Sequence, residues 1–235
     1  MTGLRATLRF LRCTVPFTAL LACPAVVPAP AHAQQDDSAL PAAAKAPAMT
    51  YRGFTVDDSA VQADGLAELR STMRQQLDMV LAVGLAPEVV AFLQAVPVVV
   101  HPAGSFARPS AGRYVGRARQ VEVTEDLVLR RHRPVLLHEF MHALHHQWVP
   151  RGLGNRELLS LYRAAQSLTA YHPRSHMMSN VQEFFACSAT TYLYGATEQE
   201  PFTREKLQAA QPELMGLLAS WFGPSAGRHV APGLN

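Results

Sequence analysis

Two histidines and one glutamate in the segment HEFMHALHH, residues 138–146, have the spacing of a metal site. His138 and His142 are four residues apart, so on a helix their side chains lie on one face, one turn apart. Both ring nitrogens could then bind one ion. Glu139 is rotated from them by about 100° and could reach a water on that ion without binding the ion itself. This HExxH pattern predicts a catalytic zinc site with Glu139 as the general base.

A third ligand has to come from elsewhere in the chain, because catalytic zinc commonly has three protein ligands. His145 lies about 10.5 Å along the helix axis from His138, too far to share an ion with it. Glu183, in the segment NVQEFFA, lies beside two phenylalanines on a second expected helix, where a carboxylate needs a cation or a donor. Glu157 is the other candidate, but its segment RELLSLYR has the pattern of an ordinary amphipathic helix. We therefore expect His138, His142 and Glu183 to bind Zn²⁺.

Together, HEFMHALHH and NVQEFFA resemble the gluzincin zinc metallopeptidases, most closely the anthrax lethal factor catalytic domain and its small bacterial relatives. The similarity covers residues 110–195. The resemblance implies a zincin-like fold and zinc-dependent hydrolysis of peptide bonds. It also implies the same ligands, His138, His142 and Glu183, with Glu139 as the base.

The sequence departs from these relatives at two positions. Seven residues before the third ligand, where the relatives carry a tyrosine that supports the oxyanion, this chain has His176, and Tyr171 is nearby in a different register. An imidazole N–H could serve as the same donor, so we take His176 as a second candidate catalytic residue. One turn after the ligand, where the relatives often carry an acidic residue, this chain has Cys187. We expect Cys187 to be a small buried residue.

The remaining histidines near the motif are expected to have ordinary roles. His145 and His146 extend the active-site helix and are expected at its surface or beside the ligands. His172 shares the loop YHPRSHMMS with His176 and is expected to be solvated. For His176 a function remains open, because loops near a site commonly carry its side chains.

The elements that must position these residues predict an α+β fold. Apolar residues recur at helical spacing over 59–83, and 86–96 predicts a short second helix. Strands of a small sheet are predicted within 49–56, 97–102 and 110–131, where Val121, Val123 and Leu127 alternate. Further helices are predicted over 134–149, 155–168, 179–195 and 203–223, and the last of these is expected to be interrupted by Pro212. The expected fold is therefore α+β and zincin-like, with an N-terminal helix and a small sheet, then the active-site helix and a mainly helical C-terminal half.

The first 33 residues have the layout of a secretory signal peptide. A start that contains three arginines precedes an apolar run over 13–27, and AHA at 31–33 is a small-x-small cleavage site. We expect cleavage after Ala33 and a periplasmic or secreted protein. The segment LLAC at 20–23 leaves lipidation of Cys23 open as an alternative.

The mature chain is then expected to contain a disordered linker over 34–48 and one zincin-like metallopeptidase domain over 49–235. The whole chain has 21 basic and 18 acidic residues, and the signal peptide removes three arginines and no acids, so 18 of each remain. This balance indicates no nucleic-acid partner, and no membrane partner unless Cys23 is lipidated. The expected partner is a peptide or protein substrate.

Two other functions compete with a peptidase. The first is a catalytically inactive, zinc-containing binding or interaction protein on the same fold, against which the intact Glu139 argues. The second is a surface-binding lipoprotein without a metal, which the metal content of the purified protein would distinguish.

Overall fold

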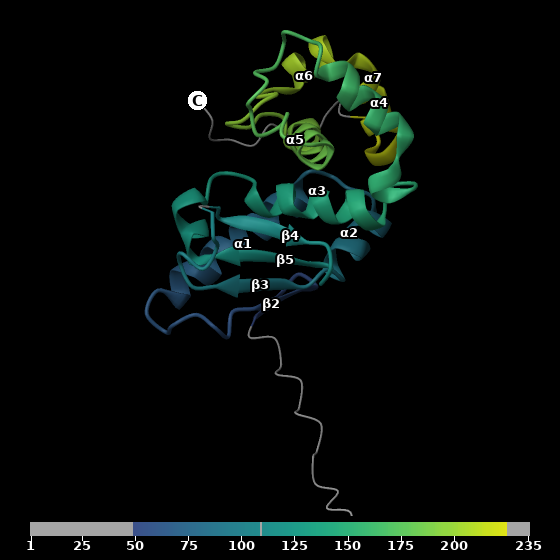
Figure 1. Ribbon diagram of the computed structural model, residues 1–235. Helices are drawn as coiled ribbons and strands as arrows, with labels where there is room; N and C mark the ends of the chain where they lie inside the picture. The colour runs from purple at the N-terminus through teal and green to yellow at the C-terminus, as the bar shows by residue number, and fades with distance from the viewer. Residues whose placement is uncertain (1–48, 109, 225–235) are drawn as a thin grey trace, which may run out of the picture. The chain divides into compact units, whose positions relative to one another are not determined.

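The computed structural model describes residues 49–108 and 110–224, in which a five-stranded sheet is followed by a group of helices (Figure 1). The strands are β1 (Met49–Tyr51), β2 (Phe54–Asp57), β3 (Val98–His101), β4 (Gly112–Val115) and β5 (Gln120–Thr124). Their order in the sheet is β1-β2-β3-β5-β4. Strands β2, β3 and β5 are parallel to one another, whereas β1 and β4 pair antiparallel at the two ends. The α+β fold predicted from the sequence is confirmed.

One face of the sheet is apolar because every second residue along the central strands is a buried valine. The buried valines on this face include Val98 and Val100 of β3 and Val121 and Val123 of β5. Helices α1 (Leu66–Ala82), α2 (Pro87–Gln94) and α3 (Val135–Gln147) contact this layer and one another. The Phe54 ring of β2 lies 5.7 Å from the Phe140 ring of α3, so the helix that carries the HExxH residues is anchored directly on the sheet.

The C-terminal half consists of α4 (Arg156–Ala165), α5 (Val181–Tyr194), α6 (Arg204–Ala210) and α7 (Pro212–Phe222). Helix α5 is buried at every position from 184 to 194, because it contacts α3, α4, α6 and α7. Asn180 caps its start by accepting a hydrogen bond from the Glu183 backbone N–H at 2.9 Å, and Gly195 with φ 102° ends it. No helix within the described ranges is long and apolar enough to cross a membrane.

The structure differs from the predicted elements at several boundaries. The expected first strand is a hairpin, because Arg52 and Gly53 both have positive φ and turn the chain between β1 and β2. The first helix begins at Leu66, and Leu127 lies in a 3-10 turn, η1 (Glu125–Arg130), instead of a strand. The predicted interruption at Pro212 is confirmed, because α6 ends at Ala210 and α7 begins at Pro212. The predicted signal peptide and linker, residues 1–48, lie outside the described residues.

Candidate metal centre

Helix α3 places His138 and His142 side by side. Their ring centroids are 4.9 Å apart, and their Nε2 atoms are separated by 3.3 Å. The start of this helix is held from outside, because Pro134 at its N-cap offers no side-chain acceptor. Gln76 of α1 supplies one instead, and its Oε1 accepts the Leu136 backbone N–H at 3.1 Å. The HExxH residues are therefore presented by a helix that is fixed at its first turn.

Helix α5 brings Glu183 to the same point. Its Oε2 lies 3.2 Å from His138 Nε2 and 3.3 Å from His142 Nε2. The neighbours Phe184 and Phe185 are fully buried, so they fix the rotation of α5 that turns Glu183 toward α3. Glu183 also stands in the first turn of α5, where the helix dipole favours a negative charge.

The spacing of these three atoms fits a zinc ion. Ligand atoms that share a tetrahedral zinc at about 2.0–2.1 Å stand about 3.3–3.4 Å apart, and the three separations here are 3.2, 3.3 and 3.3 Å. Glu183 Oε2 is buried and has no hydrogen bond within the described part of the chain, although ring nitrogens surround it. A buried carboxylate oxygen needs positive charge beside it, which a metal ion or protonated imidazoles can supply. The donor set of two imidazoles and one carboxylate is one that zinc accepts.

The protonation of this cluster follows from its burial and its mutual contacts. Burial alone would raise the pKa of Glu183, but the adjacent imidazoles of His138, His142 and His176 outweigh it, so that pKa lies far below its usual range. Burial would lower the pKa of His142, but Glu183 and Glu139 together raise it. Glu183 is thus a carboxylate, the form that binds a metal.

Glu139 is buried beside the cluster, against the sheet. Burial raises the pKa of its carboxyl above the usual range, and the charges of His138 and His142 oppose this rise only in part. Strand β4 approaches it closely at Gly112, where an added Cβ would lie 3.0 Å from Glu139 Cγ and 3.1 Å from Oε1. Glycine at position 112 therefore leaves the space that the carboxylate occupies.

His176 comes from the loop before α5 and also reaches the cluster. Its Nε2 lies 2.9 Å from Glu183 Oε2, and its ring centroid is 5.8 Å from that of His138. Half of its side chain is exposed. The pKa of His176 is raised, chiefly by its contact with Glu183. The structure thus brings together every residue that the sequence predicted for the site.

The alternative residues lie elsewhere. Glu157 is exposed on α4 and lines neither of the cavities beside the cluster. Tyr171 is buried in a separate cavity with Glu200 and Lys206, and its pKa is raised to about 12 by burial and by the Glu200 charge. His172 is exposed, as predicted.

Two histidines of α3 differ in their surroundings. His145 was expected at the surface or beside the ligands. It does not lie at the surface, because its ring is buried and the ring centroid is 4.9 Å from that of Phe185. Burial, followed by the charges of His142 and His146, lowers the pKa of His145 to about 4. His146 is half-buried, and its Nδ1 lies 3.0 Å from the Tyr114 hydroxyl. Cys187 is buried, as predicted.

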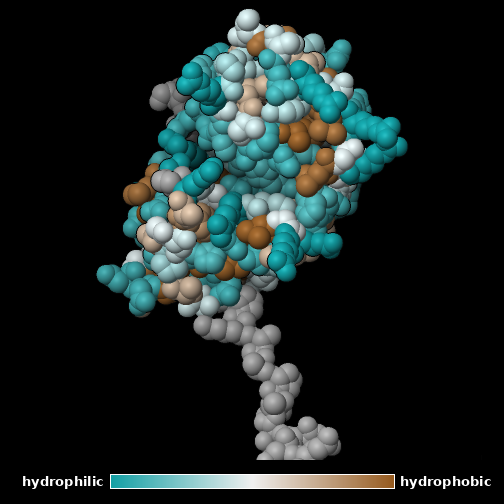
Figure 2. All heavy atoms as spheres, in the orientation of Figure 1, coloured by the Kyte–Doolittle hydropathy of each residue, from teal (hydrophilic) through white to brown (hydrophobic). Residues whose placement is uncertain are grey.

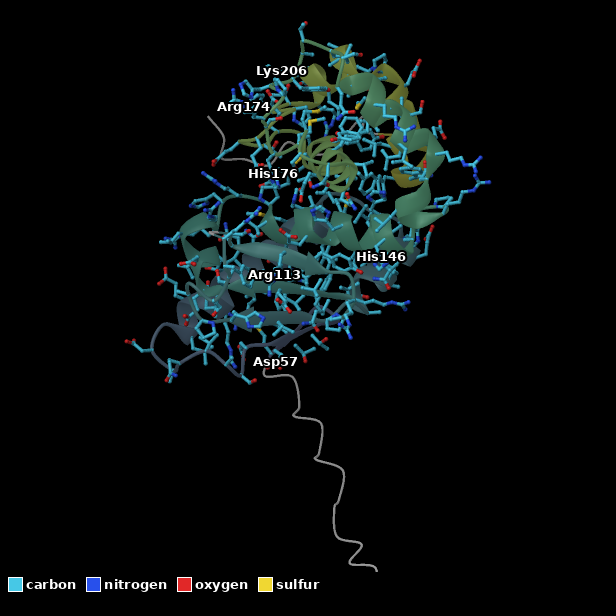
Figure 3. The ribbon with its side chains drawn as sticks, in the orientation of Figure 1. Asp57, Arg113, His146, Arg174, His176 and Lys206 are labelled. Atoms are coloured by element: carbon cyan, nitrogen blue, oxygen red, sulfur yellow. The ribbon has the colours of Figure 1, made fainter. Side chains whose placement is uncertain are left out.

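Two cavities meet at the cluster. The wider one, about 980 Å³, runs between β4, α3 from His138 to His146, and the start of α5. The narrower one, about 120 Å³, lies beside Val135, Cys187 and Thr190. His138, Glu139 and His176 line both. Figure 2 shows a mainly hydrophilic face with several smaller hydrophobic patches. Figure 3 labels His176, from the loop before α5, and Arg113, from β4, and both residues line the wider cavity.

Two residues that help to position the site, Gln76 and Gly112, could not be predicted from the sequence. Gln76 caps α3 from a helix 60 residues earlier, and no local pattern indicates that contact. Gly112 gives a weak signal, because a glycine inside a strand often marks a close backbone approach. Neither residue could be assigned without knowing which elements pack together.

Comparisons with known proteins give little further identification. No protein-family model matches the sequence, and no curated protein is significantly similar to it. Among solved structures, the Pro-Pro endopeptidase PPEP-2 from Paenibacillus alvei is similar at a TM-score of 0.44 and 16% identity. The match covers 72% of this chain and 97% of that one. At this score the likeness establishes no shared activity, so the chemistry has to be argued from the residues of the site.

Proposed function

We propose that this chain is a zinc-dependent metallopeptidase of the gluzincin type that hydrolyses peptide bonds. The observation that carries the proposal is the triangle formed by His138 Nε2, His142 Nε2 and Glu183 Oε2, whose sides of 3.2–3.3 Å suit one zinc ion. These residues would hold the ion. When bound, zinc supplies Lewis acidity, which lowers the pKa of water and polarises a carbonyl group.

Glu139 is proposed as the general base. It adjoins His138 in the sequence and lines both cavities, so its carboxylate faces the place where a substrate would lie. It takes a proton from the attacking water and passes it to the leaving amine nitrogen.

His176 is proposed as the donor that stabilises the oxyanion. It is half exposed at the junction of the two cavities, where its imidazole N–H can point at a substrate carbonyl oxygen. Such a donor contributes mainly when negative charge develops on that oxygen. The residue therefore takes the place of the tyrosine in the relatives that the sequence resembles.

The contact between His176 and Glu183 also favours a second function. His176, His138 and Glu183 bring ligand atoms within 4.8 Å of one another. If His176 were a ligand in addition to His142, the site would have four protein ligands, as in structural zinc sites. The protein would then be a zinc-containing binding or interaction protein without catalysis.

Zinc analysis of variants tests the ligand set. The purified protein should hold about one equivalent of zinc, which His138→Ala or His142→Ala should remove and chelation should strip. Glu183→Ala should weaken zinc binding, and the matched change Glu157→Ala on exposed α4 should not. Full zinc retention in both histidine variants would exclude the site.

Cleavage of a broad peptide library tests the activity. Glu139→Gln should keep zinc and fold but lower chelator-sensitive cleavage by about 10²-fold or more, because an amide does not accept the proton. His176→Ala should lower turnover with unchanged zinc content. Loss of zinc in that variant, together with no cleavage by the wild type, would favour the binding protein instead.

Export is also proposed, on the basis of the first 33 residues. The mature protein should begin at Gln34, in the periplasm or outside the cell, followed by a linker over 34–48 and the metallopeptidase domain over 49–235. N-terminal sequencing and mass spectrometry test this. A lipidated Cys23 would instead identify a membrane-anchored lipoprotein.

A further inference from the structure

The two cavities that meet at Glu139 differ in size and in charge. The wide cavity, about 980 Å³, has room for several residues of a peptide, whereas the narrow one holds about 120 Å³. A chain bound across His138, Glu139 and His176 would enter both. The two sides of the cleaved bond would therefore lie in different surroundings.

The wide side is basic. It is lined by Arg108, Arg113 and Arg117, and the described residues that line it include no acidic side chain other than Glu139 and Glu183. The narrow side is neutral, because its formal charges cancel. Its charged residues outside the cluster are Arg130, Arg133, Glu198 and Glu200.

The arginines of the wide side differ in how they are held. Arg113 is fixed on β4, where its guanidinium donates to Glu122 at 2.6 Å and lies 4.2 Å from the centre of the Phe106 ring. About half of its side chain, 51%, remains exposed. Arg108 and Arg117 are exposed, and neither has an ion-pair or hydrogen-bond partner among residues 49–108 and 110–224. Their charges are therefore available to a ligand.

We propose that the wide side of the cleft binds a substrate segment that carries acidic side chains. The proposal rests on the proposed peptidase function and adds the substrate class. Guanidinium groups bind carboxylates through paired N–H donors, and Arg108 and Arg117 stand on the rim where a peptide would pass. Because the narrow side is neutral, acidic residues should be favoured on one side of the cleaved bond only.

Binding to an inactive variant tests this independently of turnover. Zinc-loaded Glu139→Gln is titrated against fluorescent, randomised decapeptide pools, and binding is followed by fluorescence anisotropy. One pool is rich in Glu in its N-terminal half, a second is rich in Glu in its C-terminal half, and two matched pools carry Gln at those positions. We expect one Glu-rich pool to bind about threefold to tenfold more tightly than its Gln counterpart at low salt, and less so at high salt.

Variants locate the preference on the molecule. Arg108→Gln combined with Arg117→Gln, in the Glu139→Gln background, should abolish most of the preference while leaving zinc content and thermal midpoint unchanged. Arg74→Gln is the matched control, because Arg74 is exposed on α1 and lines neither cavity. It removes one positive charge away from the cleft and should leave the preference intact.

Other outcomes overturn the inference. Two of them concern the peptide pools: equal binding of the Glu and Gln pools, or an equal preference for Glu in both halves. The other two are retention of the preference in the double arginine variant, and tighter binding of a single-stranded oligonucleotide than of the Glu-rich pool. Cleavage by the wild type separates the two proposals. Cleavage without charge preference refutes only the acidic substrate, whereas selective binding of acidic peptides without any cleavage refutes only the peptidase.

Discussion

Gln76 should be a main determinant of how firmly the active-site helix is held. Its side chain is fully buried, and its amide contacts two backbone carbonyls just before α3 and one backbone N–H in the first turn of α3. Nε2 donates to the carbonyl oxygens of Arg131 at 3.0 Å and Arg133 at 2.7 Å, while Oε1 accepts the Leu136 N–H at 3.1 Å. The substitution Gln76→Met keeps the length of the side chain and removes all three bonds.

The expected cost follows from these bonds. Leaving the buried Leu136 N–H unpaired costs about 1–3 kcal/mol, and each carbonyl loses a bond of about 0.5–1.5 kcal/mol. The more apolar methionine offsets part of this loss, so we expect the free energy of unfolding to fall by about 2–4 kcal/mol. A domain of ordinary stability, about 5–15 kcal/mol, would remain folded.

Urea unfolding of Gln76→Met and wild type, both zinc-free, measures the difference. Gln94→Met is the matched control, because Gln94 Nε2 makes one exposed hydrogen bond to the Arg52 carbonyl. That control should cost less than about 1 kcal/mol. If Gln76→Met lost no more stability than Gln94→Met, the assignment of Gln76 as the external cap of α3 would be refuted.

Three further predictions concern other positions. Gly112→Ala places a Cβ 3.0–3.1 Å from Glu139 and Val135, so it should shift the base and lower peptide cleavage by about tenfold with zinc content unchanged, measured by kinetics and metal analysis. Asn180→Ala removes the cap of α5 and should lower the free energy of unfolding by about 1 kcal/mol, whereas Asn180→Asp should restore it. His145 has a folded pKa of about 4 and an ordinary value of 6.5, so the unfolded chain binds the proton more readily. The stability it contributes is therefore present above about pH 6.5 and lost as pH falls toward 4, and His145→Leu should flatten the pH dependence of urea unfolding in this window. An unchanged slope would contradict the burial of a neutral His145.

The residues of the candidate site could be predicted where the pattern is local. Residues four apart share one face in any helix, so the spacing of His138 and His142 predicts that both side chains lie on the same face. Glu183 could be favoured because a carboxylate beside two phenylalanines is unusual unless it has a partner. The alternation of Val121 and Val123 likewise predicted β5.

Tertiary packing decided what no local pattern contains. The distance between Glu183 and His138 depends on the contact between α5 and α3, and the cap supplied by Gln76 depends on the contact between α1 and α3. Similarly, His145 follows His142, a proposed ligand, by three residues, yet it is buried against Phe185 because α5 covers that face of α3.

The charge of the protein likewise depends on the sequence for its total and on the fold for its positions. The sequence by itself determined that the chain, without its first 33 residues, carries equal numbers of basic and acidic groups. Only the fold decided that Arg108, Arg113 and Arg117 line one side of the cleft while Glu122 lies on the sheet beneath Arg113. Net charge is a sum over residues and contains no positions, whereas a peptide in the cleft experiences mainly the charges within about 10 Å of it, because salt screens those farther away.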